Sequence, residues 1–483
     1  MIHSSAISYI LGQFVLAFSG TMLMPLIYGL LTGAPDTSTM TWSFVTTAVA
    51  GGGMIIVSRR PERELNQREG LLLVVAIWLC VSLFGSLPFQ FSPHFATFTD
   101  AVFEATSGFT TTGATVLADV EVLGPVVQLW RCFSHWLGGM GIVLLGVAIL
   151  PLVGHGGMHL YRAEFSGASS EKLKPRITET ALSLYKIYLS LSVMLYIALR
   201  WAGMNAYEAV CHTFSTLGTG GFSTRTASVA GFESPLIEYL LVIFMLLAGM
   251  SFVRHYLLFV EWRPRRFFED VEIRWYLLFA AISTLVISIV LVVDKGYGIE
   301  KAFRGSLFQV SSIMTTTGFV SDNFEVWPPL PQLMLLALMF VGGCTGSTAG
   351  GLKTSRIVLL ARVVDREFKR MVERRGVFAV RLGGDVIPEN VIQSLLNLIY
   401  LAFVVNFVSC LLLAAMGVDV LTSIAAVAAS MFNVGPGLGE VGPLDNYGPL
   451  PALAKWVLSG CMIAGRLEFY TVLVILTPAF WRK

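Results

Sequence analysis

The sequence predicts an all-α integral membrane protein in which four pseudo-symmetric helix, pore-loop, helix repeats surround one central pore, plus an N-terminal helix pair. The 483 residues are 55% hydrophobic and only 13% charged, about half the charged share of roughly 25% in soluble chains. Many apolar runs approach the roughly 20 residues that a helix needs to cross a bilayer. Four of the connections between these runs also share one sequence register.

Ten apolar segments are expected to cross the membrane as helices: 6–31, 41–57, 70–90, 122–153, 179–203, 235–260, 274–293, 330–360, 390–417 and 450–478. The turn-rich residues 32–36 separate the first two segments. The expected organisation is an N-terminal transmembrane helix pair at 1–68, repeat 1 at 69–161, repeat 2 at 162–265, repeat 3 with a gating loop at 266–381, and repeat 4 at 382–483.

Lysine and arginine predict the orientation of these spans, because loops retained in the cytoplasm carry the excess of basic residues. The basic connections are 59–68, 162–176, 254–274 and 353–381, and they alternate with connections that carry few cations. Both termini are therefore expected to be cytoplasmic. A second reading of the basic loops, as a docking surface for a cytosolic partner, stays open.

The fourfold repeat is the main signal in the sequence. The segments AVFEATSGFTTTG, AVCHTFSTLGTGG, SLFQVSSIMTTTG and SIAAVAASMFNVG, at 101–113, 209–221, 306–318 and 423–435, align without a gap and end in glycine. Non-helical backbone survives in a bilayer only if it is buried in protein or lines a water-filled cavity. The four loops are therefore expected to converge on one axis.

The chemistry of such an axis favours cations. A short helix of about ten residues that ends at each loop directs its negative dipole end, about half a charge, toward the axis. Backbone carbonyls then replace the hydration water of an ion, and glycine permits the required backbone shape. The alternative is four tight turns between helices. The carbonyl candidates are Thr111, Thr112, Gly113, Thr219, Gly220, Gly221, Thr316, Thr317, Gly318, Asn433, Val434 and Gly435.

A candidate gate lies in the third and fourth repeats. The glycine-rich segment, residues 342–351, cannot hold a continuous helix. The spacing of Gly138 from Gly113 predicts a break at a comparable place in repeat 1. Close helix packing by small residues is the alternative. Arg466 lies within an apolar span and is expected to face the pore or Glu468, so that a structural ion pair remains possible. The gate candidates are Gly342, Gly343, Gly346, Gly350, Gly351 and Arg466.

Several motifs resemble the superfamily of Trk, Ktr and HKT potassium transporters, and the chain length and extra helix pair look like its bacterial TrkH-type branch. These motifs are TTTGAT at 110–115, GGFST at 220–224, TTTGF at 315–319, NVGPGLG at 433–439, GGCTGSTAGGLK at 342–353 and GRLE at 465–468. The resemblance implies a filter of four single-glycine loops. In that family, glycine at the position of Gly113 accompanies a preference for potassium. In the fourth loop the residue after the glycine is Pro436, whereas loops two and three have phenylalanine there.

The resemblance also implies potassium-selective uptake, passive or weakly coupled, by a homodimer in the bacterial inner membrane. The dimer would sit on a cytosolic nucleotide-binding ring of TrkA type, and an arginine like Arg466 would act with the glycine-rich segment as the gate. Because the chain has no GxxxxGK[ST] motif, NAD or ATP is expected on the partner, with no cofactor here beyond the transported potassium ion. The stretch 362–381 is a candidate surface for this partner.

Two other function classes are weaker. An ion-coupled secondary transporter of another cation would use inverted repeats, whereas the four repeats here run in the same direction. An enzyme needs convergent acid, base or metal-binding residues, and the spans offer none, since the six cysteines lack CxxC spacing. Arg131 and Lys186, also inside apolar spans, are expected to make structural pairs or to reach toward the interface.

Overall fold

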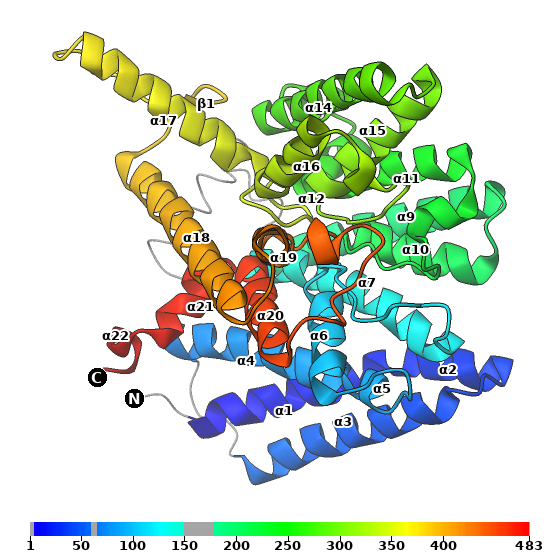
Figure 1. Ribbon diagram of the computed structural model, residues 1–483. Helices are drawn as coiled ribbons and strands as arrows, with labels where there is room; N and C mark the ends of the chain where they lie inside the picture. The colour runs from blue at the N-terminus through cyan, green and yellow to red at the C-terminus, as the bar shows by residue number, and fades with distance from the viewer. Residues whose placement is uncertain (1–3, 59–64, 149–176, 483) are drawn as a thin grey trace.

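The computed structural model describes residues 4–58, 65–148 and 177–482. The chain folds into a bundle of long apolar helices that surround four shorter ones (Figure 1). The basic connection at 162–176 and the boundary between repeats 1 and 2 lie outside the described residues, as do parts of the connection at 59–68 and of the 122–153 span.

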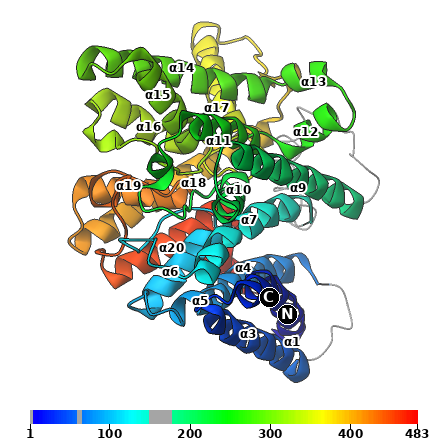
Figure 2. The same ribbon diagram turned by 90° about the vertical axis from the view of Figure 1, so that its right-hand side faces the viewer.

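The N-terminal helix pair consists of α1 (Ser4–Thr21) with its continuation α2 (Leu23–Thr32), followed by α3 (Thr37–Val57). Glycines bring α1 and α3 together: a Cβ atom on Gly12 would lie 2.8 Å from the Cβ of Met54, and one on Gly51 would lie 2.6 Å from the Leu16 nitrogen. Small residues promote such close packing between membrane helices. The pair lies at the edge of the bundle opposite α14 and α15 (Figures 1 and 2).

Each repeat then has a long first helix, a short pore helix, an extended loop and a second helix. Repeat 1 contains α4 (Gln67–Gly85), α5 (Leu87–Gln90), α6 (Phe98–Phe109) and α7 (Pro125–Ala148), and repeat 2 contains α9 (Ile177–Trp201), α10 (Ala206–Leu217), η2 (Ser228–Phe232), α11 (Pro235–Ala248) and α12 (Phe252–Phe259). The short α13 (Pro264–Phe268) leads into repeat 3, with α14 (Val271–Lys295), α15 (Ile299–Met314), η3 (Phe324–Val326), α16 (Pro329–Val341) and α17 (Thr354–Val372). Repeat 4 contains α18 (Glu389–Ala415), α19 (Val420–Met431), η4 (Gly439–Val441), α20 (Ala452–Arg466), α21 (Phe469–Leu476) and α22 (Pro478–Trp481).

A short hairpin with two residues in each strand lies at the boundary between repeats 3 and 4 and is a small departure from the all-α expectation. Strands β1 (Arg381–Leu382) and β2 (Asp385–Val386) pair antiparallel, with Arg381 opposite Val386. The turn between them is Gly383-Gly384, and both glycines have positive φ, as a tight hairpin turn requires.

The second helices of the repeats differ in continuity. Helix α7 continues through Gly138, so the expected break there is wrong; that glycine instead allows close contact, because a Cβ atom would overlap the carbonyl oxygen of Phe109. The bends lie in repeat 2, where α11 and α12 meet at 103°, and in repeat 4, where α20 and α21 meet at 119°. In repeat 3 the glycine-rich segment separates α16 from α17, as expected.

Backbone groups freed by the repeat 2 break find partners in the glycine-rich segment. The carbonyl of Gly249 accepts from the Cys344 amide at 2.7 Å, and the Phe252 amide donates to the Gly346 carbonyl at 3.0 Å. Such pairing is required in lipid, where an unsatisfied backbone group costs several kcal/mol. The breaks in repeats 2 and 3 therefore support each other.

Each of the ten expected spans contains a helix. Within the described residues, six helices are long and apolar enough to cross a membrane, or eight if each bent pair is one span. Apolar side chains such as Leu31, Ile56 and Trp201 are exposed on the outside of the bundle, as expected of lipid-facing helices. The start of α4 lies beside the C-terminus, where Arg68 donates to the Arg482 carbonyl at 2.7 Å, and Figure 1 shows the beginning of α1 on the same side.

Candidate functional site

All four pore helices end with the same backbone turn. In each repeat, the amide of the residue before the repeated glycine donates to the carbonyl five residues earlier, at 2.8 Å in every case: Thr112 to Ser107, Gly220 to Ser215, Thr317 to Ser312, and Val434 to Ala429. Every pore helix also ends four residues before its repeated glycine. The negative ends of four helix dipoles are thus placed at the same position in each repeat.

The backbone conformation of the loops repeats as closely as their hydrogen bonds. We number the pore loops by repeat as 111–113, 219–221, 316–318 and 433–435. Each glycine has a positive φ, between 77° and 98°, and so does the residue two positions earlier: φ is 56° at Thr111, 54° at Thr219, 55° at Thr316 and 56° at Asn433. Left-handed conformation is rare for β-branched residues and costs about 1–3 kcal/mol. The surrounding contacts must therefore hold these threonines in place.

The pore loops form a closed ring. A Cβ atom on Gly113 would overlap the carbonyl oxygen of Gly220, and one on Gly221 would overlap that of Thr317. The pattern continues from Gly318 to Val434 and closes from Gly435 to Thr112, where the distance would be 2.6 Å. Each glycine therefore contacts the residue that precedes the glycine of the next loop. The twelve residues singled out in the sequence all lie in this ring.

Carbonyl oxygens in the ring are largely unused by the protein. Among the described residues, Gly435 alone of the twelve has a carbonyl that accepts a hydrogen bond, from the Tyr447 hydroxyl at 2.7 Å. The hydroxyls of Thr112 and Thr317 bond to the threonine that follows the pore helix, in the Thr110–Thr112 contact at 2.8 Å and the Thr315–Thr317 contact at 2.7 Å. The ring thus presents neutral oxygen ligands, which suit a weakly bound monovalent cation.

The joint between the fourth and first loops has an additional side-chain link. Asn433 donates through Nδ2 to the Thr112 hydroxyl at 2.9 Å and to the Met462 carbonyl of α20 at 3.1 Å. This contact joins residues far apart in the sequence at the one place where the ring closes on itself. The sequence alignment identified Asn433 as a carbonyl candidate and did not predict this role of its side chain.

Buried ion pairs fix the first pore helix. Glu104 accepts from Arg131 Nε at 2.6 Å, and both side chains are almost fully buried. Asp100, at the start of α6, pairs with Lys455 of α20 at 2.6 Å. The Arg131 expectation of a structural pair therefore holds, whereas Lys186 is exposed on α9. The Asp100–Lys455 pair was missed, although a lysine inside an apolar span indicates such a partner.

The glycine-rich segment contacts the pore helices and pore loops of several repeats. Its Thr348 hydroxyl donates to the carbonyl of Leu217, the last residue of the second pore helix, at 3.0 Å. Its Gly350 amide donates to the hydroxyl of Thr316 in the third pore loop at 2.7 Å. A Cβ atom on Gly350 would overlap the Phe432 carbonyl beside the fourth loop. The segment therefore lies directly against the ring.

Arg466 connects this segment to α7. Its guanidinium donates to the Thr348 carbonyl at 2.7 Å and to the Gly138 carbonyl at 3.2 Å, and the side chain is 4% exposed. Glu468 instead pairs with Arg356 at 2.6 Å. Within the described part of the chain, no carboxylate lies at ion-pair distance from Arg466. A positive charge thus lies beside the ring with only neutral carbonyl partners.

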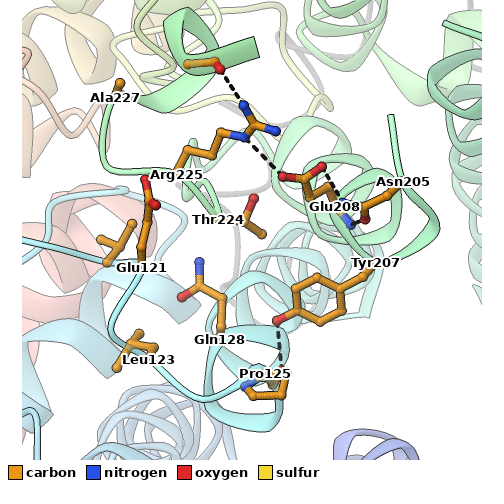
Figure 3. Close-up of a pocket in the computed structure, with 12 residues that line it drawn as sticks. Glu121, Leu123, Pro125, Gln128, Asn205, Tyr207, Glu208, Thr224, Arg225 and Ala227 are labelled. Atoms are coloured by element: carbon orange, nitrogen blue, oxygen red, sulfur yellow. Dashed lines mark hydrogen bonds and ion pairs between the residues drawn. The ribbon is translucent and has the colours of Figure 1, made fainter. Parts of the chain in front are cut away.

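A pocket of about 490 Å³ lies away from these contacts, between residues 120–128 of repeat 1 and residues 205–231 of repeat 2. Figure 3 shows Arg225 pointing across it to Glu208, a contact of 3.0 Å that pairs their charges. Tyr207 closes the lower side by donating to the Pro125 carbonyl at 2.8 Å. Of these two contacts, only the one between Tyr207 and Pro125 joins repeat 2 to repeat 1.

Comparisons with known proteins agree on one family. The family model described as "TrkH: Cation transport protein" matches residues 37–483. The chain is 41% identical to the Trk system potassium uptake protein TrkH of Salmonella typhimurium, with 100% of both chains covered, and equally identical to that of Escherichia coli K12. The crystal structure of the potassium transporter TrkH from Vibrio parahaemolyticus matches with a TM-score of 0.91 at 38% identity and covers 99% of each chain.

Proposed function

Because the chain belongs to the TrkH family of cation transport proteins, we propose that it takes up potassium ions across the membrane through the ring of four pore loops. The observation that carries this proposal is the ring itself, in which each glycine contacts the next loop until the fourth closes on the first. Its relatives are transport proteins by name, and the chain is a transporter rather than an enzyme.

The proposed filter consists of the carbonyls of residues 111–113, 219–221, 316–318 and 433–435. A potassium ion entering the ring exchanges hydration water for these carbonyl oxygens. The four pore-helix dipoles stabilise the ion without a fixed carboxylate in the ring. Because no full negative charge holds the ion, it can leave as readily as it enters.

The proposed gate is the glycine-rich segment together with Arg466. In the described conformation, the segment contacts the second pore helix and the third pore loop. The guanidinium that holds Thr348 places a positive charge where a cation has to pass. Opening requires the Thr348 contact to break and the segment to move away from the ring. The small residues in the segment permit such a movement.

The proposed assembly is a homodimer in the bacterial inner membrane, with both termini cytoplasmic, bound to a cytosolic ring of TrkA type that carries NAD or ATP. The Trk system names of the relatives support a system of several components. Helix α17 extends away from the bundle (Figure 1), and its distal side chains Phe368, Met371 and Val372 are exposed. We therefore place the regulator on this helix and the following residues, within 362–381.

Rubidium uptake tests the proposal directly. The wild-type chain and its Gly113→Ser variant are expressed with the regulator in a strain that lacks potassium transport. Wild type is expected to restore uptake, and the variant is expected to admit more sodium relative to rubidium, because the added side chain must displace the Gly220 carbonyl. Absence of uptake by a correctly inserted wild type would rule out the proposal, as would unaltered ion preference in a variant that still conducts.

A further inference from the structure

We propose that Glu272 is the positioning residue of the gate: it clamps the two ends of the glycine-rich segment together, so that only the middle of the segment moves on opening. This inference rests on the proposed gate. Glu272 lies in the first turn of α14, at the start of repeat 3, and it was not among the residues singled out from the sequence. Its contacts with residues more than seventy positions away in the sequence assign this role.

The glycine-rich segment has a narrow neck. The Thr354 amide donates to the Gly343 carbonyl at 3.0 Å, and the Leu352 amide donates to the Phe340 carbonyl at 3.0 Å. The hydroxyls of Thr345 and Ser355 are 2.9 Å apart. The chain therefore leaves α16 and enters α17 at nearly the same place. The residues between form a closed loop whose middle reaches the ring.

One carboxylate oxygen of Glu272 binds both sides of this neck. It accepts from the Thr345 amide at 2.8 Å, from the Thr345 hydroxyl at 3.1 Å and from the Ser355 amide at 3.1 Å. Hydrogen bonds to an ionised acceptor are about twice as strong as neutral ones. Glu272 thus links α14, which belongs to the fixed bundle, to both ends of the segment.

Helix α17 depends on this carboxylate for its cap. Its N-cap residue Lys353 offers no capping side chain and has an unfavourable φ of 82°. The amide of Ser355 lies in the first turn, where a negative charge also interacts favourably with the helix dipole. Glu272 supplies from another helix the acceptor that the α17 sequence lacks. Its loss therefore affects the segment and not only α14.

The middle of the segment is held differently. Thr348 contacts the carbonyls of Leu217 and Ala248 and the Arg466 guanidinium. The Gly350 amide contacts Thr316, and the Gly346 carbonyl accepts from the Phe252 amide. These contacts go to different partners, whereas the three Glu272 bonds of the neck share one carboxylate oxygen. With Glu272 in place, the neck fixes the direction in which the middle returns to the ring. Without it, the closed conformation loses its support and the pathway leaks.

The test measures rubidium flux into vesicles that contain the purified full-length chain without its regulator. Glu272→Ala is expected to raise this flux about tenfold, and Glu272→Gln, which keeps an acceptor oxygen but loses the charge, about threefold. The matched control is Asp270→Asn, two residues away on the same helix end. Asp270 caps α14 through the Ile273 amide and pairs with Arg254, and within the described residues no hydrogen bond or ion pair joins it to the segment, so the flux of this variant is expected to be unchanged.

Two further readouts separate gating from folding. The rubidium-to-sodium flux ratio is expected to stay at the wild-type value, because the ring is untouched. The double variant Glu272→Ala with Arg466→Ala is expected to conduct no more than Arg466→Ala alone, since both changes release the same closed segment. A purely structural role for Glu272 predicts a lower melting temperature and unchanged or reduced flux per folded protein.

The outcomes distinguish this inference from the gate on which it rests. If Arg466→Ala raises flux and both Glu272 variants leave it at the wild-type level, the clamp is wrong and the gate stands. If Arg466→Ala also leaves flux unchanged, the proposed gate fails, and the clamp fails with it. If the Glu272 and Arg466 effects multiply, Glu272 acts on something other than the closed segment, which overturns the clamp.

Discussion

The ring of pore loops and the glycine-rich segment beside it differ in whether their contacts are repeated. The ring repeats one backbone turn, one pair of positive φ angles and one neighbour contact in all four repeats. The segment belongs to the third repeat alone, and its contacts occur once each, among them those with the side chains of Arg466, Thr316 and Glu272. Equivalent ligands around an ion require the same loop structure in all four repeats. A movable gate requires contacts that can break while the ring stays intact.

A smaller contrast exists within the ring. At three joints, a Cβ atom on the glycine would lie 1.9 to 2.0 Å from the neighbouring carbonyl oxygen, whereas at the fourth joint it would lie 2.6 Å away, which is wider but still an overlap. At that joint alone, the residue two positions before the glycine is an asparagine rather than a threonine, and it bonds across the gap. The wider spacing and the added hydrogen bond compensate for each other.

The largest expected effect comes from breaking the ring. Gly221→Ala places a methyl group on the Thr317 carbonyl at a φ of 81°, and a left-handed alanine alone costs about 1 kcal/mol. Rubidium uptake is expected to fall at least about tenfold, because the steric overlap adds to that cost. The control is Gly53→Ala in α3, where a Cβ meets nothing within 4 Å. Equal uptake by wild type and Gly221→Ala would refute the repeated contact as a functional requirement.

The second largest effect on ion flux is expected from a change in the proposed gate. Arg466→Ala removes a buried charge that is held only by carbonyls, and it is expected to raise rubidium flux about tenfold in vesicles without the regulator. The rubidium-to-sodium ratio is expected to remain constant, since Arg466 does not belong to the ring. Lys186→Ala, on the exposed side of α9, controls for the loss of one positive charge. Unchanged flux in the Arg466 variant would contradict the gating role.

A third variant tests the fourth joint of the ring. Asn433→Thr makes the fourth loop like the other three but removes the bonds to Thr112 and Met462, each worth about 1 kcal/mol. The rubidium-to-sodium ratio is expected to fall about threefold, measured by paired tracer fluxes. The control is Asn406→Thr, which removes a side-chain amide of α18 that contacts Met431. This variant is expected to keep the wild-type ratio. Equal ratios in both variants would show that the Asn433 link is dispensable.

The smallest effect concerns the pair between Arg356 and Glu468 at the edge of the gate. Glu468 is 43% exposed, and an exposed ion pair contributes only about 0–1 kcal/mol. Glu468→Gln is therefore expected to raise flux about twofold in the same vesicles. Because water screens this pair, raising the salt concentration is expected to reduce the difference from wild type. An effect as large as that of Arg466→Ala would mean that the pair, rather than the guanidinium, closes the pathway.

The sequence predicted the parts of the molecule that are repeated. Four copies in register identified the pore loops, and the requirement for buried backbone brought them to one axis. The left-handed threonines could not be foreseen, because a β-branched residue normally avoids that conformation. The bend after Gly249 was also missed, since residues 235–260 read as one apolar span, and only the partner carbonyls and amides in the glycine-rich segment explain why the helix can break there.

Contacts that occur once were hardest to predict. Glu272 lies at the start of a helix, where a carboxylate usually interacts with its own first turn, and no local pattern indicates that it reaches Thr345 and Ser355. Arg466 was singled out by its cost in an apolar span, and its partners were open between the pore and Glu468. The structure assigns Glu468 to Arg356 instead. Contacts between residues so far apart in the sequence can be identified only from the three-dimensional structure.

The closing contact between the fourth and first loops has a consequence for biosynthesis. Asn433 and Thr112 are separated by 321 positions, so the first loop emerges long before its neighbour on that side exists. Domains form in order during synthesis, and contacts between distant residues form late. A chain that lacks repeat 4 therefore holds only two of the four joints, between loops one and two and between loops two and three, and it contains no complete ion path until the last repeat inserts. A ribosome that stalls before repeat 4 leaves a fragment that does not dissipate the membrane potential through this ring.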